Sequence, residues 1–388
     1  MNLITSKKLF NRIKRILTYP YDMKFLFFRK KRVKRNGIVL LIHESDRLGA
    51  SLLLLHTAEE MVRRNKHVYI ISLQFGELNS DYSKIAPTQV IFSKFRFKQI
   101  LKRLKEKYGY SKLLMITAAV GGYAHIASNL DYQIVSEIHE LPPVITKLGL
   151  QNSTRDMLLY SRKVLFSTND EKNGVLRLVN IKDSDRFIVK SQGTYYQKPS
   201  PNIVESAKGK LQSRYPQILR KKVIIGVGNT SYRKGFDIFI NVAKEMPQYI
   251  FLWAGKKEKF FNLVKKNGLS SNFVYLGQLN DNQLSGVYSV ASLLLLSSRK
   301  DTLPSTIFES LLFNIPVIGS RNSGGVSSVI QEGKNGLLTN EVSENDFISA
   351  INRGLLNGNY TRMKEYLIEN PLNNSFCDYI SFILQLYV

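Results

Sequence analysis

The sequence predicts an α/β protein made of two Rossmann-like, doubly wound domains that face a central cleft. Short apolar runs alternate with amphipathic segments from residue 37 onward, a pattern typical of βα units with a parallel sheet. The same alternation restarts at residues 221–229, KKVIIGVGN, after the polar segment YYQKPSPN. A chain of 388 residues is also long enough to bury two separate cores.

The first half of the chain contains the elements of one such domain. We expect these elements in the following order: a strand over 37–43, a helix over 50–64, a strand over 67–73, strands near residues 90, 114, 135 and 165, and a last strand over 187–193. The N-terminal domain is therefore predicted over 37–200.

The second half repeats this organisation and is predicted as a C-terminal domain over 201–365. Its strands are expected in six apolar runs: KKVIIGVGN, YIFLWAG, NFVYLG, ASLLLLSS, IPVIGS and GLLT. Residues 366–388 end in SFCDYISFILQLYV, which is helical in character, and the sequence leaves open whether this helix packs back across the domain boundary. A ligand is expected in the crevice between two such domains.

The charge of the chain implies an anionic partner, since 56 Lys and Arg against 30 Asp and Glu give +26. Residues 1–36 hold twelve of these cations and one acid, with apolar residues at helical spacing at Leu9, Ile13, Ile16 and Leu17. This basic amphipathic segment predicts binding to an anionic membrane surface; a solvated arm or a helix packed on the domain is the alternative. No nucleic acid is expected as a partner, because no nucleic-acid-binding pattern accompanies the charge.

Cysteine content and hydropathy indicate the compartment. The single cysteine, Cys377, excludes an internal disulfide and a thiolate metal cluster, which fits a reducing environment. No apolar run reaches about 18 residues, so no membrane span is expected. Together with the basic segment, these features predict a cytoplasmic protein held at the inner face of the cell membrane.

Residues 298–325, SRKDTLPSTIFESLLFNIPVIGSRNSGG, predict a polar site at the carboxyl end of a parallel sheet. Two carboxylates, Asp301 and Glu309, flank the turn Pro304-Ser305-Thr306, and both could reach one bound molecule. We expect the hydroxyls of Ser305 and Thr306 to cap the helix that carries Glu309. The free N–H groups of that helix start would face an anion.

The turn after the first strand of the second domain reads GVGNTSYRKGFDIFI. Its glycines resemble a dinucleotide fingerprint only loosely, because their spacing is wrong. Arg233 and Lys234 lie just before a helix that opens at Gly235 or Phe236, and two cations beside a helix start can bind a diphosphate. The alternative is a solvated basic turn.

Residues 222–340 resemble family 4 of the GT-B-fold retaining nucleotide-sugar glycosyltransferases, which belong to the group 1 glycosyltransferases. The resemblance depends on an ordered series of motifs: Arg233-Lys234-Gly235, NFVYLGQLNDNQLSGVYSVASLLLLSS, D-x7-E, NIPVIGS and SGGVSSVIQEGKNGLL. The first half is similar more loosely, through HESDRLGASLLLL and SEIHELPPVI.

The resemblance implies roles for the residues around the diphosphate. Arg233 and Lys234 match the basic pair that holds the diphosphate and stabilises its charge as the glycosidic bond breaks. Glu309 matches the acid that binds the ribose hydroxyls. Asp301 stands where the family has a glutamate that faces the transferred sugar, and its shorter side chain predicts a difference in the sugar accepted.

The same resemblance implies further donor contacts. Gly277 and Leu279 belong to the turn that holds the nucleotide base, and the backbone of Leu303, Ser305 and Thr306 would meet the diphosphate. In the first domain, Gly49 matches the glycine loop that approaches the donor phosphates and the acceptor. His139 matches a histidine that contacts the sugar, and its neighbour Glu140 is a competing candidate for an acceptor ligand or a helix cap.

A retaining, metal-independent hexosyltransferase is the activity that these matches imply. It would move a sugar from a nucleoside diphosphate donor to a hydroxyl of a glycan or lipid-linked glycan acceptor, in surface polysaccharide synthesis, without any further cofactor. His43, His56, His67 and His125 are interpreted as structural, and no spacing of histidines and carboxylates suggests a bound metal. The alternatives are a protein-modifying glycosyltransferase, a GT-B epimerase or phosphorylase, and a non-catalytic binding module.

Overall fold

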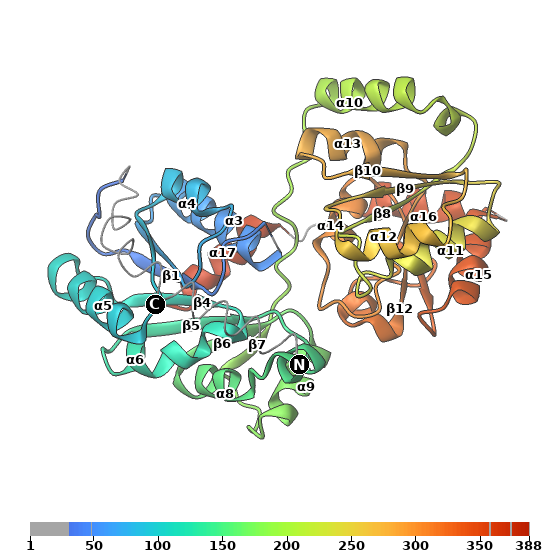
Figure 1. The fold of residues 1–388 in the computed structure, drawn as a ribbon. Helices are drawn as coiled ribbons and strands as arrows, with labels where there is room; N and C mark the ends of the chain where they lie inside the picture. Colours follow the sequence, from blue (N-terminus) through green and yellow to red (C-terminus); the bar gives the residue numbers. More distant parts are fainter. Residues whose placement is uncertain (1–30, 48, 357, 373–374, 388) are drawn as a thin grey trace. The chain divides into compact units, whose positions relative to one another are not determined.

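The computed structural model of this chain describes residues 31–47, 49–356, 358–372 and 375–387. The chain forms two compact units (Figure 1). Unit 1 comprises the residues up to Lys190 and those from Cys377 onward, and unit 2 comprises Ser191–Phe376. Most of the basic segment predicted over 1–36 lies outside the described residues, so the membrane contact assigned to it stays a prediction.

Unit 1 contains a seven-stranded parallel sheet in the order β3-β2-β1-β4-β5-β6-β7. Its strands are β1 (Ile38–Ile42), β2 (Val68–Ser72), β3 (Thr88–Val90), β4 (Lys112–Ile116), β5 (Gln133–Ile138), β6 (Lys163–Phe166) and β7 (Phe187–Val189). Its helices are α3 (Gly49–Arg63), α4 (Asn79–Ile85), α5 (Lys94–Tyr108), η1 (Ala118–Tyr123), α6 (Ala124–Ser128), α7 (Pro142–Leu148), α8 (Gln151–Tyr160), α9 (Asn169–Leu178) and α17 (Phe376–Gln385).

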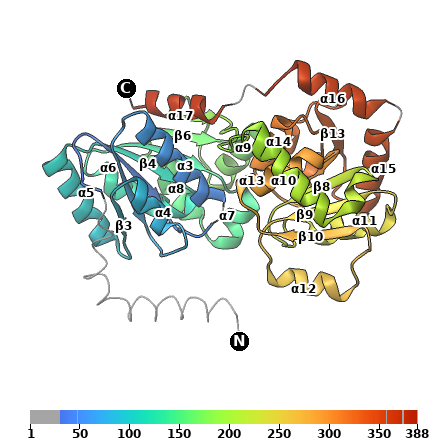
Figure 2. The same cartoon turned by 90° about the horizontal axis from the view of Figure 1, so that it is seen from above.

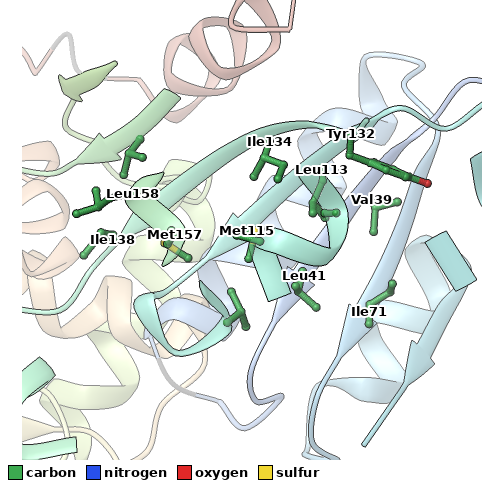
Figure 3. Packing of buried hydrophobic residues seen from close by; sticks show 14 of the residues in the cluster. Val39, Leu41, Ile71, Leu113, Met115, Tyr132, Ile134, Ile138, Met157 and Leu158 are labelled. Carbon is green, nitrogen blue, oxygen red and sulfur yellow. The ribbon is translucent and has the colours of Figure 1, made fainter. Parts of the chain in front are cut away.

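Helices cover both faces of this sheet, which explains why its central strands are apolar throughout. In Figure 1, α5, α6 and α8 lie on one side and α3, α4 and α17 on the other. Because successive side chains of a strand point to opposite faces, alternate residues serve each core. Figure 3 shows the first core, in which strand residues Val39, Leu41, Leu113, Met115 and Ile134 pack with Met157 and Leu158 of α8.

Unit 2 contains a six-stranded parallel sheet in the order β10-β9-β8-β11-β12-β13. Its strands are β8 (Val223–Val227), β9 (Ile250–Ala254), β10 (Phe273–Gly277), β11 (Leu293–Leu295), β12 (Val317–Ser320) and β13 (Gly336–Thr339). Its helices are α10 (Pro201–Arg214), η2 (Pro216–Leu219), α11 (Phe236–Glu245), α12 (Lys259–Lys266), α13 (Asp281–Val290), α14 (Ser305–Leu312), η3 (Arg321–Ser323), η4 (Gly325–Ser328), α15 (Glu344–Leu355) and α16 (Asn359–Glu369). Figure 2 shows α10 lying beside α13.

Both sheets have a topological switch point, at which consecutive connections leave in opposite directions. In unit 1 the first strand, β1, lies between β2 and β4, and in unit 2 the strand β8 lies between β9 and β11. Ligands of open α/β sheets bind outside the carboxyl ends of the strands at such a point. The chain that follows β8 and β11 is therefore the first place to examine in unit 2.

The units divide before the boundary near residue 200 that the sequence predicted, because residues 194–196 pack in unit 2. Tyr196 is buried against Tyr288 and Phe313, and its hydroxyl donates to the carbonyl of Asp281 at 3.0 Å. Thr194 also forms a parallel bridge with Ser375, so the two ends of unit 2 lie side by side.

The last helix, α17, joins unit 1 rather than unit 2. Arg64, just after α3, donates to the carbonyl of Cys377 at 2.7 Å and to the hydroxyl of Ser381 at 2.6 Å. In the part of the chain that the structure describes, no helix has both the length and the apolar character of a membrane span.

Candidate functional site

The turn between β8 and α11 is built against the chain that leaves β11. Gly235 has φ 65°, and a Cβ at this position would overlap the carbonyl oxygen of Ser297. Only glycine combines this backbone conformation with such close approach. The Ser297 hydroxyl donates to the carbonyl of Lys234 at 3.1 Å, and the N–H of Arg299 donates to the carbonyl of Arg233 at 2.8 Å. The basic pair is thus fixed at the switch point of unit 2.

Arg299 reinforces this turn. Its guanidinium forms two hydrogen bonds of 2.7 Å with the Asp237 carboxylate and lies 3.7 Å from the centre of the Tyr232 ring. Such a bidentate pair restricts both side chains. The sequence interpretation missed Arg299, although a basic residue beside a predicted diphosphate turn was a signal that could have identified it.

Asp301 lies next to both predicted cations. The Lys234 ammonium forms an ion pair with Asp301 Oδ2, and Arg233 Nη1 lies 3.4 Å from the same oxygen. Burial disfavours the charged form of Asp301, whose side chain is 13% exposed, but Lys234 and Arg233 outweigh it and lower the pKa of this carboxyl. Two cations therefore share one anion, and a surplus positive charge remains for a ligand.

The backbone around Asp301 pairs with the loop after β12. The N–H of Asp301 donates to the carbonyl of Ser323 at 2.6 Å, and the N–H of Gly325 donates to the carbonyl of Thr302 at 2.8 Å. This contact brings the chain that follows β12 to the chain that follows β11. The predicted serine-glycine-glycine loop is part of the same site.

Glu309 is the fifth of the eight residues of α14 and is 6% exposed. Its Oε2 accepts a hydrogen bond of 2.7 Å from the Tyr288 hydroxyl, and its Oε1 accepts one of 2.8 Å from Ser305 Oγ. Burial raises the pKa of Glu309 above its ordinary value, and these two hydrogen bonds oppose the shift. The sequence did not identify Tyr288 as a partner of this carboxyl.

The predicted capping of α14 by hydroxyls is wrong. Pro304 occupies the N-cap position without a side-chain cap, and the Ser305 hydroxyl turns to Glu309, four residues along the helix, instead. The Thr306 hydroxyl is buried and has no hydrogen-bond partner among the described residues. This hydroxyl and the N–H groups of the helix start are suited to an anion.

The remaining donor residues lie in unit 2 with different surroundings. Gly277 ends β10, and its carbonyl accepts a hydrogen bond of 2.8 Å from the N–H of Gly255. The side chain of Leu303 is buried in the core between the sheet and α14, and that of Leu279 packs on the same core. Their backbone contacts with a nucleotide stay predictions.

His139 follows β5 in unit 1 and is held by two glutamates. Its Nε2 lies 3.0 Å from Glu137 Oε2, and its N–H donates to Glu140 Oε2 at 3.1 Å. Glu140 Oε2 also accepts from the N–H of Ala118 at 3.0 Å. The competing candidate Glu140 therefore ties two loops together, while the His139 side chain remains 17% exposed.

Gly49 is the first residue of α3, and a Cβ there would meet no atom of the described residues within 4 Å. Packing within unit 1 therefore does not require a glycine at this position. Its predicted contact with a ligand is untested by the fold.

The switch point of unit 1 contains a pair that the sequence interpretation missed. Thr117, just after β4, has φ 80°, which is rare for a β-branched residue and typical of functional sites. Its hydroxyl forms a hydrogen bond of 2.9 Å with Nδ1 of His43, a residue interpreted as structural. The sequence contains no signal of this backbone conformation.

Among the described residues, no group of three or more His, Cys, Asp and Glu side chains could hold a metal ion. The predicted residues thus fall into one set in unit 2, around Asp301 and Glu309, and one set in unit 1, around His139 and Gly49.

Comparisons with known proteins concern the sequence and the fold of the chain. Residues 210–371 match the sequence profile of the family described as "Glycosyl transferases group 1". The alpha-galactosylglucosyldiacylglycerol synthase of Streptococcus pneumoniae is 29% identical over 104 residues, which is 25% of this chain and 28% of that protein. The chain thus spans less than a third of that relative's length.

Two solved structures show the same fold. Anabaena HepE in complex with UDP has a TM-score of 0.75 at 17% identity and covers 90% of this chain and 98% of its own. Sucrose-phosphate synthase from Thermosynechococcus elongatus has a TM-score of 0.74 at 17% identity, with coverage of 90% and 98%. The predicted α/β fold of GT-B type with two Rossmann-like units is confirmed.

Proposed function

We propose, because residues 210–371 match the profile of the group 1 glycosyl transferases, that the chain transfers a hexosyl group from a nucleoside diphosphate sugar. The acceptor is a hydroxyl of a glycan or lipid-linked glycan, and the anomeric configuration is retained. The observation that carries this proposal is the pair Arg233 and Lys234, held on Asp301 at the switch point of unit 2.

The diphosphate of the donor binds to these two cations. Their charges are fixed before the ligand arrives, because the turn at Gly235 packs on Ser297. Cations placed in advance stabilise the negative charge that grows on the diphosphate as it leaves, and one such donor is worth about a hundredfold in rate. Thr306 and the start of α14 supply further donors.

Glu309 accepts hydrogen bonds from the ribose hydroxyls. Tyr288 and Ser305 fix the orientation of its carboxyl. Asp301 faces the transferred sugar, and its short side chain selects which sugar fits.

Transfer occurs on one face of the sugar. The bond between the anomeric carbon and the diphosphate oxygen breaks, the diphosphate keeps the bonding electrons, and the acceptor oxygen forms the new bond on the same face. The acceptor's proton passes to the leaving diphosphate. We favour this route because the sequence contains no evident carboxylate nucleophile.

The reaction is proposed to need no metal, since Arg233 and Lys234 take the place of a cation on the diphosphate. An assay with and without excess EDTA tests this point. Activity that survives chelation supports it, and activity that is lost and then restored by Mg²⁺ or Mn²⁺ contradicts it.

The acceptor is proposed to lie at a membrane on the cytoplasmic side, for surface polysaccharide synthesis. The name of the Streptococcus pneumoniae relative, a glycolipid synthase, supports a lipid-linked acceptor. The basic segment 1–36 would attach the chain to anionic lipid. Sedimentation with vesicles containing phosphatidylglycerol should decrease when residues 1–35 are deleted, and undiminished sedimentation would remove this role.

A screen of nucleotide sugars by thermal shift identifies the donor. A ligand at a hundred times its Kd stabilises the native state by about 2.7 kcal/mol, which raises the melting temperature by roughly 5 to 10 °C. Lys234→Ala should abolish this shift and lower transfer about a hundredfold. The matched control is Lys244→Ala, because Lys244 lies at the other end of α11 and its ammonium donates to the carbonyl of Asn267 at 3.0 Å. Equal activity of Lys234→Ala and the control would refute the donor site.

A further inference from the structure

A buried group of ionisable side chains lies behind His139 in unit 1, and the proposed reaction uses none of them. Glu137 of β5 and Glu171 of α9 are both 0% exposed, and Tyr379 of α17 is 2% exposed. Burying a carboxyl lowers the stability of the fold unless the group is paired or protonated, so apolar side chains at these positions would give a more stable core. The group therefore calls for a reason other than packing.

Strand alternation directs the Glu137 side chain toward α17. Ser136 and Ile138 of β5 point to the face covered by α8, so Glu137 points to the opposite face, where α17 lies. There the Tyr379 hydroxyl bonds to the Glu137 carboxylate, and Glu137 Oε2 lies 3.0 Å from His139 Nε2.

Glu171 completes the group from α9. Its Oε2 accepts a hydrogen bond of 2.7 Å from the N–H of Ser167, and its charge would act on His139. Burial raises the pKa of Glu171 to about 8, although His139 opposes the shift, so Glu171 is neutral at pH 7. Glu137 Oε2, 3.0 Å from Nε2, is the direct partner of the imidazole.

His139 meets opposing influences on its charge. Burial disfavours its imidazolium, but the hydrogen bond to Glu137 and the charge of that carboxyl outweigh burial and raise the pKa of His139. The pKa of Tyr379 is raised well above its ordinary value by burial and by Glu137, so Tyr379 acts as a hydrogen-bond donor.

We infer that Glu137 and Tyr379 are positioning residues for His139. The Tyr379 hydroxyl holds the Glu137 carboxylate, and that carboxylate keeps Nε2 of His139 protonated and the ring in one orientation. The inference depends on the proposed function, in which His139 contacts the transferred sugar. One partner in the chain of contacts comes from the last helix, far from His139 in sequence.

The experiment measures His139 directly in the free protein by ¹H–¹⁵N NMR of its imidazole, with the signals assigned by their loss in His139→Gln. In the native protein, the Nε2 proton should exchange slowly with water. Glu137→Gln should lower the pKa of His139 and make this proton exchange rapidly. Tyr379→Phe, which removes one oxygen and preserves packing, should also speed the exchange.

A matched control is Tyr110→Phe. Tyr110 is also buried in unit 1, but its hydroxyl has no hydrogen-bond partner among the described residues. Its removal should change neither the His139 signals nor transfer. Glu137→Gln should lower kcat by about ten- to a hundredfold, because a misplaced contact acts mainly in the transition state. Tyr379→Phe should lower kcat by a smaller factor.

The outcomes separate this inference from the proposed function. Full transfer activity in His139→Gln would remove His139 from the reaction, whatever its NMR signals show. Loss of transfer in His139→Gln, with native His139 exchange and native kcat in both Glu137→Gln and Tyr379→Phe, would overturn the positioning role alone.

Discussion

Replacing Glu171 with glutamine should remove the contribution of this carboxyl to the pH dependence of unit 1 stability above about pH 5. The native side chain is fully buried, and burial raises its pKa from 4.5 to about 8. Between these values the folded chain keeps a proton that the unfolded chain releases. Because the unfolded state then binds fewer protons, the free energy of unfolding falls as pH rises.

The magnitude follows from the displacement of this pKa. Each unit of pKa difference corresponds to about 1.4 kcal/mol, so a shift from 4.5 to about 8 amounts to about 5 kcal/mol over the full range. Glutamine resembles the protonated acid in shape and can keep the acceptor for the N–H of Ser167. The variant should match the native chain near pH 5 and exceed its stability by about 4 kcal/mol near pH 8.

Urea unfolding at several pH values provides the assay. The sole tryptophan, Trp253, lies in unit 2, so its fluorescence reports that unit alone, whereas circular dichroism follows both units. The substitution should shift the unfolding of unit 1, seen by circular dichroism, and leave the unfolding of unit 2, seen by tryptophan fluorescence, unchanged. If the free energy of unfolding of unit 1 changed with pH in the same way in the native chain and the variant from pH 5 to pH 8, a protonated Glu171 would be refuted.

Two further predictions concern unit 2. Gly235→Ala should destabilise unit 2 by more than Gly268→Ala, since both positions have positive φ but only a Cβ at Gly235 overlaps Ser297. The midpoint of unfolding, followed by tryptophan fluorescence, measures both effects. Equal effects would contradict the contact. Tyr288→Phe should raise the pKa of Glu309 further, because a hydrogen bond that favours the carboxylate is lost. As the pH is lowered, UDP binding measured by calorimetry should therefore begin to weaken at a higher pH in the variant than in the native protein. An unchanged pH profile of binding would contradict this.

Local sequence patterns predicted most of the fold, because each sheet is made of continuous apolar runs separated by amphipathic helices. The run ASLLLLSS shows where this reasoning ends. Its strand covers only Leu293–Leu295, since Ser297 leaves the sheet to hold the backbone of Lys234. A contact between residues so distant in sequence cannot be inferred from composition.

The sequence predicted which residues form the candidate site but not which of them are in contact. The motifs identified Arg233, Lys234 and Asp301, but their mutual ion pairs depend on the adjacency of β8 and β11. Glu137 and Tyr379 were missed, although a glutamate inside the apolar run YQIVSEI was a signal of a buried polar group.

The bridge between Thr194 and Ser375 has a consequence for biosynthesis. Unit 1 is discontinuous, and its last helix is synthesised only after all of unit 2. Until then, Glu137 lacks Tyr379, and the sheet face that carries α3 and α4 lacks α17. The chain between the rest of unit 1 and α17 forms a loop that must close before α17 can dock. Since the bridge joins the two ends of unit 2, folding of unit 2 shortens this loop. We therefore expect unit 2 to fold before α17 docks and before Tyr379 reaches Glu137.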